Sequence, residues 1–103
     1  MPKIKIITIK SPIGMELQLT TLGATIISLK VPDKNGKLVN VAVGLKSPSN
    51  YLAESYLRHN LLLGSTVGRY AGRISNGGFK IENKWYKLHH ENGVHLHGGK
   101  VGF

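Results

Sequence analysis

The sequence predicts an all-β chain of mostly antiparallel strands with one short helix. Segments rich in isoleucine, valine, threonine and tyrosine, which are residues enriched in strands, recur along the 103 residues. Glycine, proline, asparagine or aspartate separates these segments, as expected of turns. A single segment has the features of a helix start. The pattern as a whole predicts about seven short strands.

The first two strands are predicted to form a hairpin. Residues 3–9 alternate lysine with isoleucine, which is the period of a half-buried strand. The turn residues proline and glycine follow within residues 11–14. Residues 15–20 then alternate methionine or leucine with polar side chains, which predicts the partner strand.

A second hairpin is predicted on either side of Asn35-Gly36. Residues 23–31 are mostly apolar and β-branched, which is typical of a strand buried on at least one face. Asn35-Gly36 is a dipeptide that supplies the positive φ angles of hairpin turns. Residues 38–43 are expected to form the returning strand.

The helix is predicted to begin at Ser47-Pro48 and to run for one or two turns, to about residue 56. Ser47 can cap the helix, and Pro48 at the first helical position loses no useful donor. A later hairpin is predicted over Phe79–Leu88, with Asn83-Lys84 at its turn. Asparagine tolerates the left-handed conformation that such a turn requires.

Composition excludes several classes of protein. The chain has no cysteine, so it has neither disulfides nor thiolate metal sites. No apolar run is long enough for a membrane span, and the start, Met1-Pro2-Lys3, lacks the apolar core of a signal peptide. We therefore expect a cytoplasmic protein without a membrane partner.

The net charge of +9 comes from 14 lysines and arginines against 5 acidic residues. A charge of this size is compatible with nucleic-acid binding. The lysines, however, are scattered singly, and no basic run or aromatic-basic platform is present. A solvated basic surface, with no nucleic-acid partner, is therefore the preferred interpretation.

Two short strings carry most of the chemistry. GSTVGRYAGRI, from Gly64 to Ile74, combines three glycines with two arginines, and NGVHLHGG, from Asn92 to Gly99, combines two histidines with a glycine pair. Glycine lets the backbone approach a ligand, and arginine offers a planar fork of donors. The two strings predict a site for a small polar ligand.

Both strings resemble the N-terminal signature of the aldose 1-epimerases, the galactose mutarotases. The usual form of that signature is close to G-x-T-x-GRYANRI, then a hairpin, then N-x-x-x-x-LHGG-x-x-GF. Here the last part reads LHGGKVGF and ends at Phe103. The resemblance implies that residues 1–103 are the N-terminal part of one galactose-mutarotase-like β-sandwich domain, about its first third, truncated after LHGG. It implies an aldose sugar as the small-molecule partner.

The resemblance also implies roles for individual residues. Arg73 and His97 occupy the positions of the family's sugar-binding arginine and histidine, and Arg69, His95 and Asn92 are expected to support them. Even spacing would place Arg69 and Arg73 on one strand face, provided that no bulge intervenes at residue 72, and likewise His95 and His97. The family favours asparagine at residue 72, where this chain has glycine.

Mutarotation requires a base that takes the anomeric proton and an acid that protonates the ring oxygen. In the family a glutamate and a further histidine, both beyond Phe103, have these roles. No catalytic residue is therefore expected within this chain, although Glu91 is a local candidate base. The resemblance implies an isomerase family without a cofactor, and we expect the 103 residues alone to have little or no epimerase activity.

Other interpretations remain open. One is a non-catalytic carbohydrate-binding or interaction module on the same scaffold. Another is a metal site, in which His89 or His90 joins the pair at residues 95 and 97, although catalytic metal sites usually add a carboxylate. A third is nucleic-acid binding. We also expect the isolated chain to self-associate through exposed strand edges, or to require further polypeptide.

Overall fold

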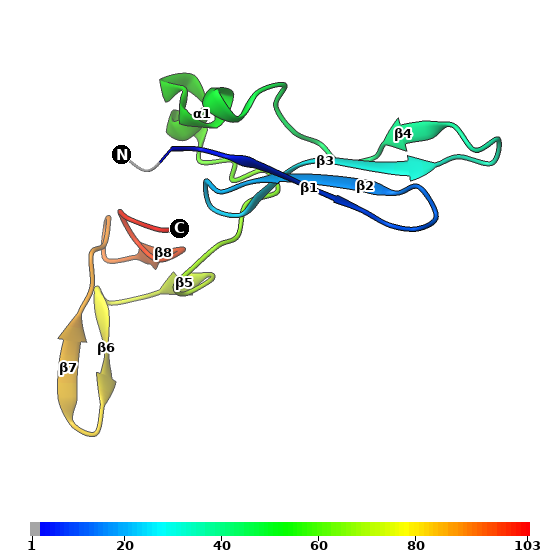
Figure 1. Cartoon of the computed structure of the whole chain (residues 1–103). Helices are drawn as coiled ribbons and strands as arrows, with labels where there is room; N and C mark the ends of the chain where they lie inside the picture. Colours follow the sequence, from blue (N-terminus) through cyan, green and yellow to red (C-terminus); the bar gives the residue numbers. More distant parts are fainter. Residues whose placement is uncertain (1–2) are drawn as a thin grey trace. The chain divides into compact units, whose positions relative to one another are not determined.

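The structure is a computed structural model that describes residues 3–103 (Figure 1). The prediction that the chain lacks a signal peptide was made on its first three residues. Residues 1 and 2 of these lie outside the residues that the structure describes. The chain divides into two compact units, the first ending at Thr66 and the second spanning Val67–Phe103. The assignment of residues 1–103 to one domain stays a prediction.

The first unit contains a four-stranded antiparallel sheet. Its strands are β1 (Ile6–Lys10), β2 (Glu16–Thr20), β3 (Thr25–Pro32) and β4 (Leu38–Asn40), and they pair in the order β1-β2-β3-β4 (Figure 1). Each strand therefore lies beside its neighbour in sequence, as hairpin connections require. The structure confirms both predicted hairpins.

The first strand differs from the prediction in its bounds and its burial. It begins at Ile6 rather than at residue 3, and all five of its residues are exposed. Because β1 is an edge strand, it has a hydrogen-bonding partner on one side only. The prediction of a half-buried strand was therefore wrong. The alternation of lysine with isoleucine correctly indicated a strand, but neither face of that strand is buried.

The turn between β3 and β4 is built around Asp33. Its carboxylate Oδ1 accepts hydrogen bonds from the backbone N–H groups of Asn35 and Lys37, at 2.8 and 2.9 Å. Gly36 has a φ of 80°, but Asn35 is not among the residues with positive φ. The prediction of two positive φ angles was wrong, because the aspartate side chain, an Asx turn, holds the first part of the loop.

Strand β4 is shorter than the predicted range of residues 38–43, because a side chain replaces the ladder after Asn40. The Oδ1 atom of Asn40 accepts from the backbone N–H of Leu29 at 3.0 Å and from that of Ala42 at 3.1 Å. A side-chain acceptor of this kind competes with regular pairing. Only one further backbone bond, from Val41 N–H to the Leu29 carbonyl, continues the contact.

The predicted helix is two short helices. A 3₁₀ helix (Pro48–Leu52) precedes α1 (Glu54–His59), and Ala53 lies between them in an extended conformation. Pro48 stands in the first turn as predicted. Ser47 is the N-cap residue, but its hydroxyl pairs with that of Ser49 at 2.8 Å and makes no capping bond to the backbone.

Two tyrosines fix the segments around these helices. The Tyr51 hydroxyl accepts from Leu45 N–H at 2.9 Å, and the Tyr56 hydroxyl accepts from Leu63 N–H at 2.8 Å. The two rings meet edge to face, with their centroids 5.2 Å apart. Among the described residues, Tyr51 is the only apolar side chain counted as buried.

Large apolar side chains are otherwise widely exposed in the first unit. On β1, Ile6, Ile7 and Ile9 expose 52%, 43% and 54% of their surface. Because successive strand residues point to opposite faces, both faces of β1 carry exposed isoleucine. The small buried set in this unit includes two polar residues, Thr20 and Thr25.

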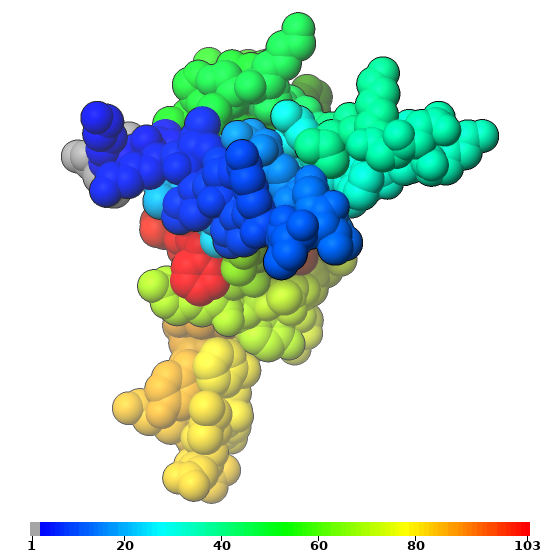
Figure 2. All heavy atoms as spheres, turned by 45° about the vertical axis from the view of Figure 1, so that its right-hand side comes forward, coloured from blue at the N-terminus to red at the C-terminus, as the bar shows by residue number. Residues whose placement is uncertain are grey.

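The second unit contains two short ladders (Figure 1). Strands β5 (Arg73–Ile74) and β8 (His95–Leu96) pair antiparallel, and β6 (Gly78–Ile81) pairs with β7 (Lys84–Lys87). The β6–β7 hairpin, coloured yellow to orange, projects from its unit (Figure 2). The described residues thus form eight strands, close to the predicted number.

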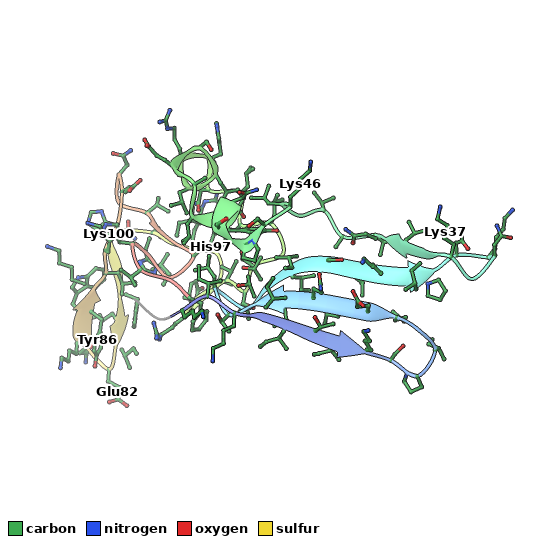
Figure 3. All side chains as sticks on the ribbon, turned by 45° about the horizontal axis from the view of Figure 1, so that its top comes forward. Lys37, Lys46, Glu82, Tyr86, His97 and Lys100 are labelled. Atoms are coloured by element: carbon green, nitrogen blue, oxygen red, sulfur yellow. The ribbon has the colours of Figure 1, made fainter. Side chains whose placement is uncertain are left out.

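The hairpin turn lies one residue earlier than predicted. Its central residues are Glu82 and Asn83, with φ angles of 45° and 66°, whereas Lys84 already belongs to β7. Glu82 stands at the tip of this hairpin (Figure 3). The left-handed conformation predicted for Asn83 is confirmed. The cross-strand pair of Phe79 and Tyr86, with stacked rings 5.5 Å apart, sets the register that leaves Glu82 in the turn.

Within residues 3–103, no helix combines the length and the apolar character that a membrane crossing would need.

Candidate functional site

The two sequence motifs meet in the β5–β8 ladder. Arg73 pairs with Leu96, and Ile74 pairs with His95. The same register places Gly72 opposite His97, and the His97 N–H donates to the Gly72 carbonyl at 2.9 Å. Residues from the two ends of the second unit are thereby brought to adjacent positions.

The Gly72–His97 pair departs from a regular ladder in one respect. In a hydrogen-bonded antiparallel pair, two residues exchange both of their N–H···O bonds. Here the N–H of Gly72 donates instead to Nδ1 of the His97 ring, at 3.0 Å. The backbone at His97 has a φ of 48°, so the strand ends there and the ring nitrogen takes the place of the carbonyl as acceptor.

His95 is held differently. Its side chain is only 6% exposed, and its Nδ1 lies 2.7 Å from the carbonyl oxygen of His89. His97 is half-buried, and it follows the end of β8. The prediction that His95 and His97 share the face of a regular strand is therefore wrong, because the left-handed backbone at His97 interrupts the alternation.

Close backbone contact surrounds this ladder. A Cβ atom on Gly98 would overlap the carbonyl oxygen of Gly68, and Gly98 also has a φ of 85°. A Cβ on Gly68, in turn, would run into the ring of Phe103. Glycine is required at residue 98 for the two backbone segments to approach as they do, whereas a Cβ at residue 68 would displace the Phe103 ring.

Arg73 is exposed at the start of β5. Within residues 3–103, its guanidinium makes no hydrogen bond or ion pair with another side chain, so its five donors are available to a ligand. The three ion pairs involve Lys10, Lys30 and Arg58 instead.

Arg69 has a different environment. Its guanidinium lies 5.4 Å from the centroid of the Phe103 ring, a cation–π distance. It is not in a strand, and Gly72 has a φ of 95°, so a regular alternation does not link Arg69 to Arg73. The predicted common strand face of the two arginines is wrong for this reason.

Asn92 lies in a tight turn next to the ladder. Glu91 and Val94 exchange backbone hydrogen bonds around it, and Asn92 and Gly93 have φ angles of 49° and 81°. Asn92 therefore shapes the turn that precedes β8. Glu91 is a turn residue and is exposed.

The remaining histidines lie outside the ladder. His59, His89 and His90 are exposed. In the part of the chain that the structure describes, no three histidine or acidic side chains are grouped so that they could hold a metal ion. The metal-site interpretation required such a group.

Sequence reasoning missed the role of the backbone at Gly72. Its N–H orients the His97 ring. Every residue except proline has a backbone N–H, so the sequence does not indicate which of them makes such a contact. The available signal was the glycine itself, since a φ of 95° is open to glycine and strained for other residues. The packing of Phe103 on Gly68 was missed as well.

Comparison with known proteins identifies this arrangement. The family model described as aldose 1-epimerase matches residues 5–103. The chain belongs to the aldose 1-epimerase family. The match includes both motifs and the hairpin between them.

Individual relatives agree with this assignment. A probable aldose 1-epimerase of Arthroderma benhamiae is 42% identical over 84 residues, covering 79% of this chain and 19% of the relative. An aldose 1-epimerase of Haemophilus influenzae is 39% identical over 97 residues, which are 93% of this chain and 26% of the relative. The chain thus spans about a quarter or less of the length of these two relatives.

Solved structures confirm the predicted fold class. An aldose epimerase homologue from C. elegans superimposes with a TM-score of 0.77 at 32% identity, covering 97% of this chain and 30% of that one. A galactose 1-epimerase from Lactobacillus acidophilus gives a TM-score of 0.71 at 28% identity. The mostly antiparallel fold with one short α-helix is therefore part of the galactose mutarotase-like fold.

The contact between Gly68 and Gly98 makes a testable prediction. We expect Gly98→Ala to disrupt the β5–β8 ladder, because the new methyl group would meet backbone atoms, which cannot move aside as a side chain can. Gly93→Ala is the matched control: Gly93 also has a positive φ, of 81°, but no heavy atom lies within 4 Å of its Cβ position. Amide hydrogen exchange at Gly72 and His97 measures the effect. Equal protection of these amides in both variants would contradict the prediction.

Proposed function

We propose that the protein functions as an aldose 1-epimerase that interconverts the α and β anomers of aldohexoses such as galactose and glucose. Residues 1–103 supply the sugar-binding side of its active site through Arg73 and His97. The observation that carries the proposal is the 3.0 Å contact between the Gly72 N–H and Nδ1 of His97, which fixes the His97 ring opposite the residue that precedes Arg73. Family membership supplies the reaction.

The chemistry of these groups suits a sugar. Arginine stays protonated, so it can hold a sugar oxygen without changing state. With Nδ1 of His97 engaged by Gly72, the other ring nitrogen is the one left for a ligand hydroxyl. Arg69, His95 and Asn92 are positioning residues in this proposal, through the Phe103 stack, the His89 carbonyl and the turn at residues 91–94.

The catalytic acid and base are proposed to lie in polypeptide outside residues 1–103. The second unit contains two carboxylates only, Glu82 and Glu91. Glu82 stands at the hairpin tip (Figure 3). Glu91 lies in an exposed turn. Neither is held beside the β5–β8 ladder by any hydrogen bond of its side chain within the described residues.

A cytoplasmic location stays a prediction.

Sugar binding and turnover can be tested separately by NMR. We expect the 103-residue chain to leave anomer exchange of galactose and glucose at the spontaneous rate, and saturation transfer to detect sugar binding. Arg73→Ala should weaken binding about tenfold or more, since a hydrogen bond to a charged group contributes ~1.5–3 kcal/mol. Arg58→Ala is the control, because Arg58 is an exposed arginine already paired with Glu54 at 2.9 Å.

Two results would contradict the proposal. One is an acceleration of anomer exchange by this chain that disappears in Arg73→Ala, which would show that no outside acid or base is needed. The other is equal weakening by the Arg73 and Arg58 variants, which would remove Arg73 from the site. Sugar binding in a full-length parent that shows no turnover would favour the alternative, a non-catalytic carbohydrate-binding module.

The basic surface is proposed to be solvated rather than to bind nucleic acid. Within the first unit, Lys37 and Lys46 lie on different segments and are well separated (Figure 3). The second unit's Lys84 lies over the Tyr86 ring at 5.3 Å. No nucleic-acid or membrane partner is included in the proposal.

Self-association through β1 is a further part of the proposal on partners. Exposed isoleucines on both faces of an edge strand favour pairing with another chain. We expect the sedimentation coefficient to rise with concentration, and Ile7→Lys to reduce that rise, because β1 would then place a charge in the contact. Val43→Lys, at an exposed position outside the strands, is the control. A monodisperse monomer that unfolds cooperatively would contradict the prediction.

A further inference from the structure

We infer that Gly72 and His89 hold His97 and His95 in opposite tautomers, so that the β5–β8 ladder presents one ring N–H donor and one ring-nitrogen acceptor two residues apart. Gly72 and His89 act as positioning residues through their backbone groups. The assignment of a sugar hydroxyl as the ligand rests on the proposed function, whereas the tautomers themselves do not.

The tautomer of His97 follows from its partner. A backbone N–H can only donate, so Nδ1 of His97, 3.0 Å from the Gly72 nitrogen, must accept. In the neutral ring the proton is then on Nε2. The reciprocal bond from His97 N–H to the Gly72 carbonyl, at 2.9 Å, holds the two residues in this pairing.

The tautomer of His95 follows by the opposite argument. A carbonyl oxygen can only accept, so Nδ1 of His95, 2.7 Å from the His89 carbonyl, must donate. In the neutral ring Nε2 then carries the lone pair. The ring also lies close to Gly99, where an added Cβ would stand 2.9 Å from its Cε1 atom. A flip of the ring would place a C–H group against the carbonyl and lose the bond.

The remaining nitrogen of each ring is not fully enclosed. Within residues 3–103, no buried side-chain nitrogen or oxygen lacks a hydrogen-bond partner. Nε2 of His95 and Nε2 of His97 have no partner there, so each keeps some exposure. In the inferred tautomers Nε2 of His97 is a donor and Nε2 of His95 is an acceptor. A sugar hydroxyl can accept from the half-buried His97, whereas His95, at 6% exposure, stays a positioning residue.

The test is the ring ¹⁵N spectrum of the chain labelled with ¹⁵N-histidine, at a pH where the histidines are neutral. Histidine-to-glutamine variants assign the five histidines. We expect His97 to show a protonated Nε2 and His95 a protonated Nδ1, each as a single tautomer. The same tautomer at both positions, or a mixture of tautomers at His97, would overturn the inference. This result does not depend on sugar or on any variant at Gly72.

Gly72→Ala then tests the cause. A φ of 95° is strained for alanine, so the N–H should move away from Nδ1, and the single-tautomer pattern of His97 should be lost while that of His95 stays. Gly93→Ala is the control, because Gly93 has a φ of 81° and donates its N–H to Nδ1 of His90, at 3.2 Å. It should change His90 and leave His97 unchanged. Loss of the His97 pattern in both variants would contradict the role of Gly72.

Adding galactose separates this inference from the proposed function. If the tautomers are as inferred and the Nε2 resonance of His97 shifts, both are supported. If the tautomers are as inferred and sugar does not shift the His97 ring, the tautomer assignment stands and the proposed function fails.

Discussion

The candidate site depends on one close approach of the backbone, between the segment that starts at Gly68 and the segment that ends at Gly98. A Cβ atom on Gly98 would overlap the backbone at Gly68 and so separate the two segments. Their approach brings Gly72 opposite His97 and so forms the contact that orients the ring. Two glycine-rich motifs, separated in the sequence by residues 75–91, are therefore one structural unit, and the chemistry of the histidine follows from the conformational freedom of glycine.

The two units of the chain use different means of stabilisation. The first relies on a four-stranded sheet and on two tyrosines that accept backbone hydrogen bonds, with very little apolar burial. The second relies on short ladders and on tight turns with positive φ angles. Burial of apolar area is the main favourable term in folding. We expect this chain to associate with further polypeptide because association would bury the exposed isoleucines of β1.

Much of the fold could be predicted from the sequence, because Asn, Asp, Gly and Pro mark the turns. Arg73 and His97 were found through their motifs. The turn at Glu82-Asn83 could not be placed, since glutamate has no preference for positive φ and the register is set by Phe79 and Tyr86 across the hairpin. The prediction that His95 and His97 lie on one strand face failed because the backbone at His97 is left-handed, and the sequence does not indicate this.

The central claim is that His97 contacts the sugar through the nitrogen that Gly72 leaves free. Intermolecular nuclear Overhauser effects between galactose protons and the His97 ring, in the ¹³C-histidine-labelled chain, test it most directly. The account predicts contacts to the Hε1 proton of His97 and none to those of His59 or His90, which are exposed elsewhere. Sugar contacts at His59 or His90 with none at His97 would contradict it.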